Sequence, residues 1–200
     1  MTLVLHGHPA SANTHRVRLM LSLLGLSWRE ELVDLLRGQQ RGATFRQVNP
    51  AGQVPALVDD AVVVWDSHAI VAYLAQTYGG PDWWPASGTE LAAVLPWLFF
   101  DANEIHNGIG YARNHHAFGV SCDVEAAADR GRAALAVLDQ RLADHAWLAL
   151  DRPGLADVAC YPMVAVADEA GLDIAPYPAV GRWLERLATL PGFVPMSRLR

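Results

Sequence analysis

The stretch that most constrains the fold covers residues 49–80 and reads NPAGQVPALVDDAVVVWDSHAIVAYLAQTYGG. Val54, Ala56 and Val58 alternate with their neighbours, and a short run of β-branched apolar residues comes after the acidic pair at 59–60. This pattern is typical of two strands joined by a tight turn. The segment therefore predicts a β-hairpin.

A helix is expected directly after the hairpin. Asp66 and Ser67 are residue types that cap helix N-termini, and the glycine pair at 79–80 is typical of a helix end. The apolar residues between these signals recur at the spacing of a buried helical stripe, namely Ile70, Tyr73, Leu74 and Tyr78. The stretch thus predicts strand, turn, strand and helix in that order.

Two positions in this stretch have the chemistry to contact a ligand. Pro55 has no N–H to give to a sheet, so the backbone of Val54 is free to pair with an extended peptide. Ser67 combines a hydroxyl with the free N–H groups and dipole of a helix N-terminus, which suits a carboxylate. From the residues alone, an ordinary helix cap is the favoured interpretation of Ser67.

A strand, a helix and a second strand are predicted before this stretch. The strands cover residues 2–6 and 28–35, and the helix between them carries Val17, Met20, Leu21 and Leu24 on one side. Ser11 and Asn13 lie where the first strand passes into the helix, and capping explains either of them. The polar loop after the second strand contains Arg37, Arg41 and Arg46, which form a solvated face or an anion site.

The order of these elements predicts a fold of two parts. Residues 1–80 form an α/β domain of topology βαβαββα with a mixed four-stranded sheet, a thioredoxin-like layout. Residues 80–88 break all periodicity and are the predicted linker, with Trp83 and Trp84 as packing anchors between the domains. Residues 89–200 are rich in Ala and Leu and predict an all-helical domain.

Three motifs resemble one known family. The order NPxGQVPxL, a Val/Trp strand and D-S-x-A-I is similar to the cytosolic glutathione S-transferases, of the bacterial, phi/theta-like Ser/Asn type. The PxSxNxxRV segment at residues 9–17 and GLADVA at residues 154–159 also resemble that family, although Gly154 replaces its usual hydroxyl residue. The resemblance implies a cis bond between Val54 and Pro55 and glutathione as co-substrate.

The resemblance also implies a role for each matching residue. Ser11 is the catalytic residue expected at the sulfur of glutathione, with Asn13 as the second candidate. Val54 pairs with the cysteinyl backbone, while other residues hold the γ-glutamyl and glycine ends. The glutathione-binding set is Gln40, Arg41, Gln53, Val54, Pro55, Asp66 and Ser67.

The second domain offers a candidate pocket for a second substrate. Residues 90–116 predict a long helix, in which Gly108 and Gly110 indicate a bend or a close approach. If this helix packs against the ligand loop, its polar residues line the pocket, namely Asn103, His106, Asn107, Tyr111 and Arg113. A solvated or subunit-facing stripe explains the same residues.

A later helix is predicted to start at Gly154, where the side chain of Asp157 is expected to accept the N–H of Gly154.

Composition narrows the classes of function. A chain of 200 residues with 52% hydrophobic content buries a sizeable core, and a net charge of -6 argues against nucleic acid or an anionic membrane as partner. No apolar run reaches the roughly 18 residues of a membrane span, and no basic leader is present, so we expect a cytoplasmic protein. Cys122 and Cys160 are expected to be buried free thiols. No metal site is predicted, because the histidines form no ligand pattern.

The expected function is that of a glutathione-dependent transferase in detoxification, which directs a stabilised thiolate at a hydrophobic electrophile or a peroxide. Glutathione peroxidase or disulfide reductase activity would use the same thiolate. The alternative is a non-catalytic binding or structural module of the same fold. We also expect a homodimer, because residues 96–106 and the linker are rich in Trp and Phe, and we expect Asp101 to reach the neighbouring subunit's site.

Overall fold

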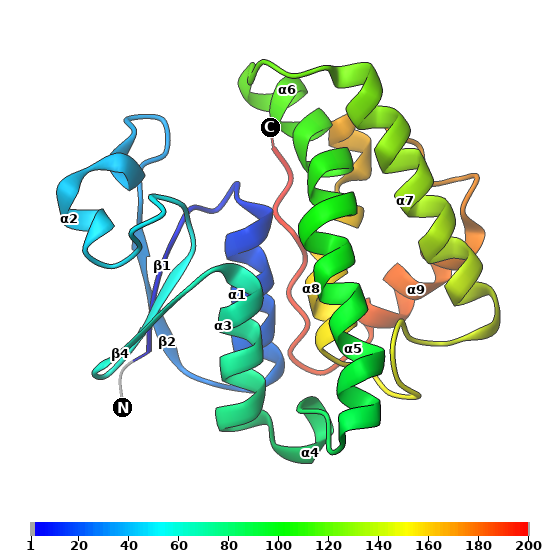
Figure 1. Ribbon diagram of the computed structural model, residues 1–200, viewed down its shortest axis with the longest axis horizontal. Helices are drawn as coiled ribbons and strands as arrows, with labels where there is room; N and C mark the ends of the chain where they lie inside the picture. The colour runs from blue at the N-terminus through cyan, green and yellow to red at the C-terminus, as the bar shows by residue number, and fades with distance from the viewer. Residues whose placement is uncertain (1–2, 200) are drawn as a thin grey trace.

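The structure is a computed structural model in which residues 3–199 are described, and it places a four-stranded sheet beside a group of helices (Figure 1). The strands are β1 (Leu3–Gly7), β2 (Trp28–Leu32), β3 (Ala56–Asp59) and β4 (Val62–Trp65). Their order is β2-β1-β3-β4, with β1 parallel to β2 and antiparallel to β3, and with β3 antiparallel to β4. The predicted mixed sheet and the hairpin are confirmed.

Two helices separate the sheet from the rest of the molecule. Helices α1 (Ala12–Leu23) and α3 (Ser67–Leu74) lie between the sheet and the second domain, while the short η1 (Gln39–Arg41) and α2 (Ala43–Arg46) lie on the far side of the sheet (Figure 1). Leu5 and Leu57 of the sheet are fully buried, as are Val17 of α1 and Ile70 of α3. These residues form the apolar layer that the alternating and helical patterns predicted.

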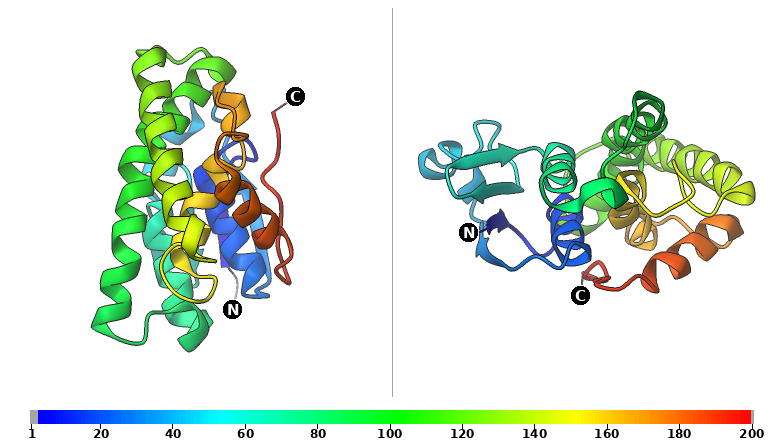
Figure 2. Two further views of the ribbon diagram at one scale, coloured as in Figure 1. Left: turned by 90° about the vertical axis from the view of Figure 1, so that its right-hand side faces the viewer. Right: turned by 90° about the horizontal axis from the view of Figure 1, so that it is seen from below.

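The second domain is helical, as expected. The elements after α3 are η2 (Ala75–Gly79), α4 (Gly80–Trp83), α5 (Gly88–Phe100), the π-helical η3 (Asp101–Gly110), α6 (Tyr111–Phe118), α7 (Val124–Asp144), α8 (Leu155–Val164), η4 (Ala167–Ala170) and α9 (Pro178–Ala188). Helix α8 is buried along its whole length and contacts α1, α3 and α5. The two views of Figure 2 show that the segment after α9 returns toward the first domain. The segment after α9 therefore lies beside α1 of the first domain, where Nε2 of His15 is 3.1 Å from the carbonyl of Val194.

The long helix predicted over residues 90–116 is one continuous helical path through α5, η3 and α6 (Figure 1). Its middle has π-helical hydrogen bonding and packs against α7. The predicted close approach is present at Gly108, where an added Cβ would lie 2.6 Å from the backbone nitrogen of Gly131. Two glycines thus let the backbones of two helices touch.

Some predicted boundaries were wrong. The second strand ends at Leu32 rather than at residue 35, because β1 ends at Gly7, whose carbonyl accepts a last bond from Val33. Part of the predicted linker is the short helix α4. Cys160 is buried as expected, whereas Cys122 is only partly buried. The domain limits 1–80 and 89–200 stay a prediction, and within residues 3–199 no helix combines the length and apolar character of a membrane span.

Candidate functional site

The N-terminus of α3 is capped by Asp66, which leaves the neighbouring Ser67 for another role. Asp66 has a φ of 70°, and its Oδ1 accepts bonds from the N–H groups of His68 at 2.9 Å and Ala69 at 3.2 Å. The His68 side chain, together with these N–H groups, lowers the pKa of Asp66 to about 2 against the opposing effect of burial. Asp66 is therefore a carboxylate at neutral pH.

The hydroxyl of Ser67 is held by a buried arginine to which the sequence analysis assigned no role. Arg16 of α1 is fully buried, and its Nη1 donates to Ser67 Oγ at 2.6 Å and to Asn13 Oδ1 at 2.8 Å. Its Nε donates to the carbonyl of Ala159 in α8 at 2.9 Å. One guanidinium thus connects two predicted site residues with the second domain.

Asp101 balances the charge of this arginine, which corrects the expectation that Asp101 reaches a neighbouring subunit's site. Asp101 is fully buried within its own chain, where Oδ2 accepts from Arg16 Nη2 and lies 2.8 Å from Nε2 of His68. Its other oxygen, Oδ1, has no partner among residues 3–199. The π-helical start of η3 therefore supports the N-terminus of α3 from inside.

Ser11 is the N-cap of α1. Its Oγ accepts from the N–H of Thr14 at 3.2 Å, and its own N–H closes a turn onto the carbonyl of His8 at 3.0 Å. Because the oxygen accepts, the hydroxyl proton is available to a ligand. Asn13 lies two residues further on, in the first turn of α1, with Oδ1 engaged by Arg16, so its Nδ2 is the group that can donate.

The bond between Val54 and Pro55 is cis, as the family resemblance implied. Val54 precedes β3, and its backbone groups make no hydrogen bond within the described part of the chain. The preceding loop is fixed by Asn49, whose Nδ2 donates to the carbonyl of Gln53 at 2.6 Å and whose Oδ1 accepts from Ala51 at 2.9 Å. A rigid loop thus presents an open backbone segment.

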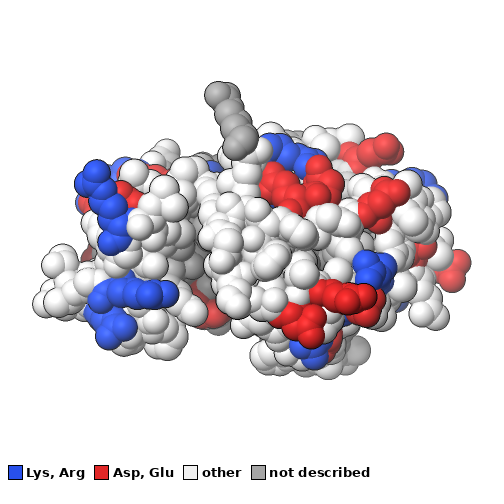
Figure 3. All heavy atoms as spheres, turned by 90° about the horizontal axis from the view of Figure 1, so that it is seen from above, with Lys and Arg blue, Asp and Glu red and all other residues white. Residues whose placement is uncertain are grey.

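The residues predicted to bind the glycine end of glutathione come from two adjacent loops. An added Cβ at Gly52 would lie 3.1 Å from the carbonyl oxygen of Gln40 and 3.3 Å from Nε of Arg46. Arg41 and Gln53 are exposed, and Gln40 Oε1 is buried without a partner among residues 3–199. Figure 3 shows basic side chains on the sheet domain and acidic ones gathered over the helical domain. The contacts at Gly52 place Arg46 beside Gln40, one of the residues predicted to bind glutathione.

The residues predicted to bind a second substrate divide between two sides of the long helix. Arg113 reaches the first domain, where Nη1 donates to the carbonyl of Ala10 at 3.0 Å. His106 lies near Asp101, and burial is the main cause that lowers its pKa. Asn103 accepts from Asn107 at 2.9 Å on another side of the helix.

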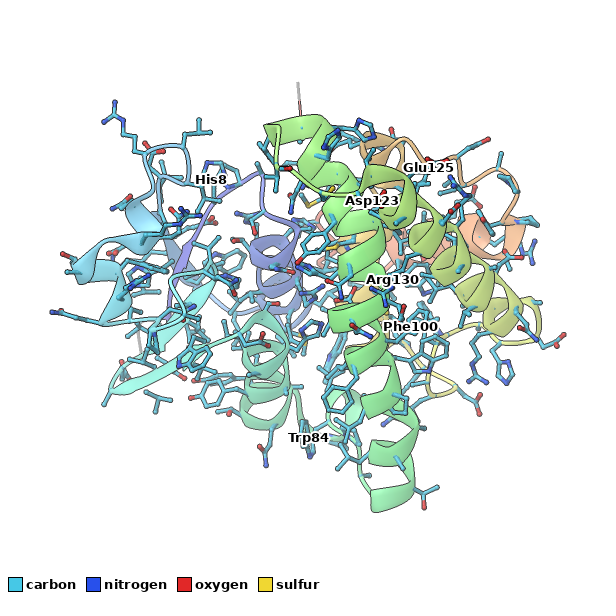
Figure 4. The ribbon with its side chains drawn as sticks, turned by 45° about the horizontal axis from the view of Figure 1, so that its top comes forward. His8, Trp84, Phe100, Asp123, Glu125 and Arg130 are labelled. Atoms are coloured by element: carbon cyan, nitrogen blue, oxygen red, sulfur yellow. The ribbon has the colours of Figure 1, made fainter. Side chains whose placement is uncertain are left out.

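A separate cavity of about 570 Å³ lies between this helix and α7. It is lined by Asn107, Tyr111, Cys122, Asp123, Ala126, Ala127 and Arg130. Figure 4 labels Asp123 and Arg130 beside the long helix, away from His8 of the first domain. Whether either side of the helix receives a second substrate stays a prediction.

Sequence reasoning assigned no role to Arg16 or His68, and it assigned Asp101 to the neighbouring subunit's site. A signal for Arg16 was present, because it repeats the spacing of Ala12 and Met20 along the buried side of α1. A charged residue on a buried stripe needs a partner of opposite charge. Nothing in the sequence indicates which acidic residue that partner is.

Comparisons with known proteins agree over both domains. Residues 10–77 match the family described as "Glutathione S-transferase, N-terminal domain", and residues 103–191 match "Glutathione S-transferase, C-terminal domain". Glutathione S-transferase GstB of Escherichia coli K12 is 32% identical over 196 residues, which cover 94% of each chain. Disulfide-bond oxidoreductase YfcG of the same strain is 30% identical, over 90% of this chain and 87% of the relative.

Some of the similar solved structures contain glutathione. One of them is a glutathione transferase homologue from Lodderomyces elongisporus, described with two glutathione molecules per subunit. Its TM-score is 0.85 at 25% identity, over 96% of this chain and 95% of that chain.

Proposed function

Because the chain belongs to the glutathione S-transferase family, we propose that it is an enzyme that binds glutathione, stabilises its thiolate and directs that thiolate at a hydrophobic electrophile. The observation that carries the proposal is that the hydroxyl oxygens of Ser67 and Ser11 both accept hydrogen bonds from the protein. Ser67 Oγ accepts from Arg16 and Ser11 Oγ accepts from Thr14, so both hydroxyl protons are free to donate to an anion. One suits the γ-glutamyl carboxylate and the other suits the sulfur.

The γ-glutamyl end carries a carboxylate and an ammonium group, and the N-terminus of α3 matches both. Ser67 donates to the carboxylate, and the guanidinium of Arg16 behind it strengthens that bond by polarising the hydroxyl. Asp66, ionised at neutral pH, pairs with the ammonium group. The ring of His68 lies between the two carboxylates, with Nδ1 facing Asp66 and Nε2 facing Asp101, and so holds Asp66 in place.

The rest of the tripeptide follows the first domain. Val54 pairs with the cysteinyl backbone through its open N–H and C=O, while Gln40, Arg41 and Gln53 hold the glycine carboxylate. Arg suits a carboxylate because its fork of N–H groups matches two oxygens. With both ends held, the cysteinyl sulfur lies at the start of α1.

At that position two effects favour the thiolate over the thiol. The hydroxyl of Ser11 donates to the sulfur, and the dipole of α1 stabilises a negative charge at its N-terminus. The thiolate then attacks the electrophilic carbon, so that a carbon–sulfur bond forms and the leaving group departs with its electron pair. The protein thus supplies orientation and a lowered thiol pKa.

A second candidate function is reduction of a disulfide or a peroxide by the same thiolate, which the name of the 30% identical YfcG favours. The thiol would be that of glutathione, because Cys160 is buried in α8 and Cys122 lies beside the carbonyl of Tyr111 in the second domain. A non-catalytic module that retains glutathione is the alternative. A cytoplasmic location, a role in detoxification and a homodimer complete the proposal.

The test is a titration of the bound thiol by its thiolate absorbance, for the native protein and for Ser11→Ala and Asn13→Ala. A free thiol titrates near about 8.5, and loss of one hydrogen bond to the anion should raise the bound value by about one unit. We expect this rise in Ser11→Ala, with glutathione affinity by calorimetry unchanged. A shift in Asn13→Ala alone would reverse the two roles.

Two further outcomes would reject parts of the proposal. If the native protein binds glutathione but its thiol titrates as in solution, the protein is the non-catalytic module. If calorimetry detects no binding of glutathione at millimolar concentration, the proposed function as a whole is wrong.

A further inference from the structure

A buried arginine of the second domain contacts the loop that carries Ser11. Arg113 in α6 is almost fully buried, and its Nη1 donates to the carbonyl of Ala10 at 3.0 Å. Its Nε donates to Oε2 of Glu169 at 2.7 Å. The guanidinium therefore spans from η4 to the first domain, with the ring of Phe118 at 6.0 Å.

The bond to Ala10 holds the peptide unit that orients Ser11. A peptide unit is planar, and its C=O and N–H point in opposite directions. Here the C=O of Ala10 is held by Arg113, while the N–H of Ser11 is held by the carbonyl of His8 at 3.0 Å. Both ends of the unit are fixed, so the direction in which Ser11 leaves the turn is fixed as well.

The carboxylate behind Arg113 also holds the last part of the chain. Oε1 of Glu169 accepts from the N–H of Leu199 at 2.8 Å, while Oε2 is engaged by Arg113. The same C-terminal segment lies along α1, where Nε2 of His15 is 3.1 Å from the carbonyl of Val194. Three regions distant in sequence therefore meet at one ion pair.

We propose that Arg113 is a positioning residue for Ser11, and that Glu169 and the segment 194–199 hold Arg113 in the required place. The inference rests on the proposed function only for its catalytic consequence. Its structural content, the immobilisation of the turn at residues 8–11, holds with or without glutathione. Arg113 is thus assigned to the support of the thiol site rather than to the binding of a second substrate.

The first test measures hydrogen exchange of the backbone in the protein without glutathione. In Arg113→Gln the segment 8–15 should exchange about tenfold faster than in the native protein, because the turn loses one of its two anchors. Arg132→Gln is the matched control, since Arg132 is exposed on α7 and pairs only locally with Asp129. Unchanged exchange of residues 8–15 in Arg113→Gln would overturn the proposal.

The second test measures the catalytic consequence with glutathione bound. In Arg113→Gln the thiolate fraction at neutral pH should fall about fivefold to tenfold, with a matching loss in kcat and little change in KM for glutathione. Arg113→Lys should recover only part of this, because an ammonium group cannot bridge Ala10 and Glu169 as a planar fork does. Glu169→Gln should lower the thiolate fraction as well, but by less than Arg113→Gln.

The two tests separate the two proposals. If the native protein does not lower the pKa of the thiol, the proposed function fails, and the exchange experiment still decides the role of Arg113. If the native protein does lower it and Arg113→Gln changes only the melting temperature, Arg113 is a stabilising residue and the inference is wrong.

Discussion

Replacing Arg16 with Met is expected to destabilise the protein more than loss of any surface charge. Arg16 gives hydrogen bonds to Ser67, Asn13 and the carbonyl of Ala159, and it pairs with Asp101. Both side chains of the ion pair are almost completely buried. Removing one partner of a buried pair costs about 3–5 kcal/mol, because the other charge is left without compensation.

The expected loss of stability comes from Asp101, whose charge would lose its partner. In Arg16→Met its Oδ2 would keep His68, while Oδ1 already has no partner among residues 3–199. A native protein is stable by about 5–15 kcal/mol, so the expected loss is a large part of the total. If the charge on Asp101 is removed as well, the loss should be smaller than the sum of the losses in the two single variants.

Urea unfolding followed by tryptophan fluorescence measures the effect, with Arg16→Met, Asp101→Asn and the double variant compared at one pH. We expect a coupling energy of about 2 kcal/mol between the two positions, in the range measured for residues of one network. Arg132→Met is the control and should change stability by less than about 0.5 kcal/mol. A loss below about 1 kcal/mol in Arg16→Met, or strict additivity in the double variant, would refute the reasoning.

Three further predictions follow from the same structure. Ser67→Ala should weaken glutathione binding by roughly 1.5–3 kcal/mol in calorimetry but lower the free energy of unfolding by only about 1, because Asp66 keeps its capping bonds; equal losses would contradict the ligand role. Burial raises the pKa of Asp157 from 3.8 to about 6, so its protonated form favours the folded state, and that stability is lost as the pH rises from about 4 to 6. The native protein should therefore lose about 3 kcal/mol relative to Asp157→Asn over that range in urea unfolding, and a pH-independent difference would exclude the shift. A homodimer is expected from the exposed Trp65 and Phe99, and a monomeric mass by light scattering at micromolar concentration would reject it.

The parts of the fold that could be predicted from the sequence are those encoded locally. The hairpin and the cap of α3 depend on residues within a few positions of one another, and the structure confirms them. The bond between Asp157 and the N–H of Gly154 was also expected, and it is present at 3.0 Å. In each case backbone geometry and side-chain spacing decide the result before the chain becomes compact.

The interior of the candidate site could not be predicted in the same way. Arg16 and Asp101 are 85 positions apart, and nothing near either residue indicates the other. From the sequence, Asp101 is expected to reach a neighbouring subunit's site because residues 96–106 are rich in Trp and Phe. Its real partner depends on how α1 packs against the second domain, which is a property of the whole fold.

The contact between Gly108 and Gly131 has a consequence for how mutational data on this protein should be interpreted. A methyl group at either position would meet heavy atoms at 2.6 Å: the backbone of Gly131 in one case and the side chain of Leu172 in the other. A scan of all single substitutions would therefore find Gly108 as intolerant as the residues proposed to hold glutathione, because a helix backbone cannot move aside, and Gly131 less so, because the end of the Leu172 side chain can shift. Intolerance at these two glycines would report the distance between two helices, and growth or abundance data need a binding measurement beside them before any position is assigned to the site.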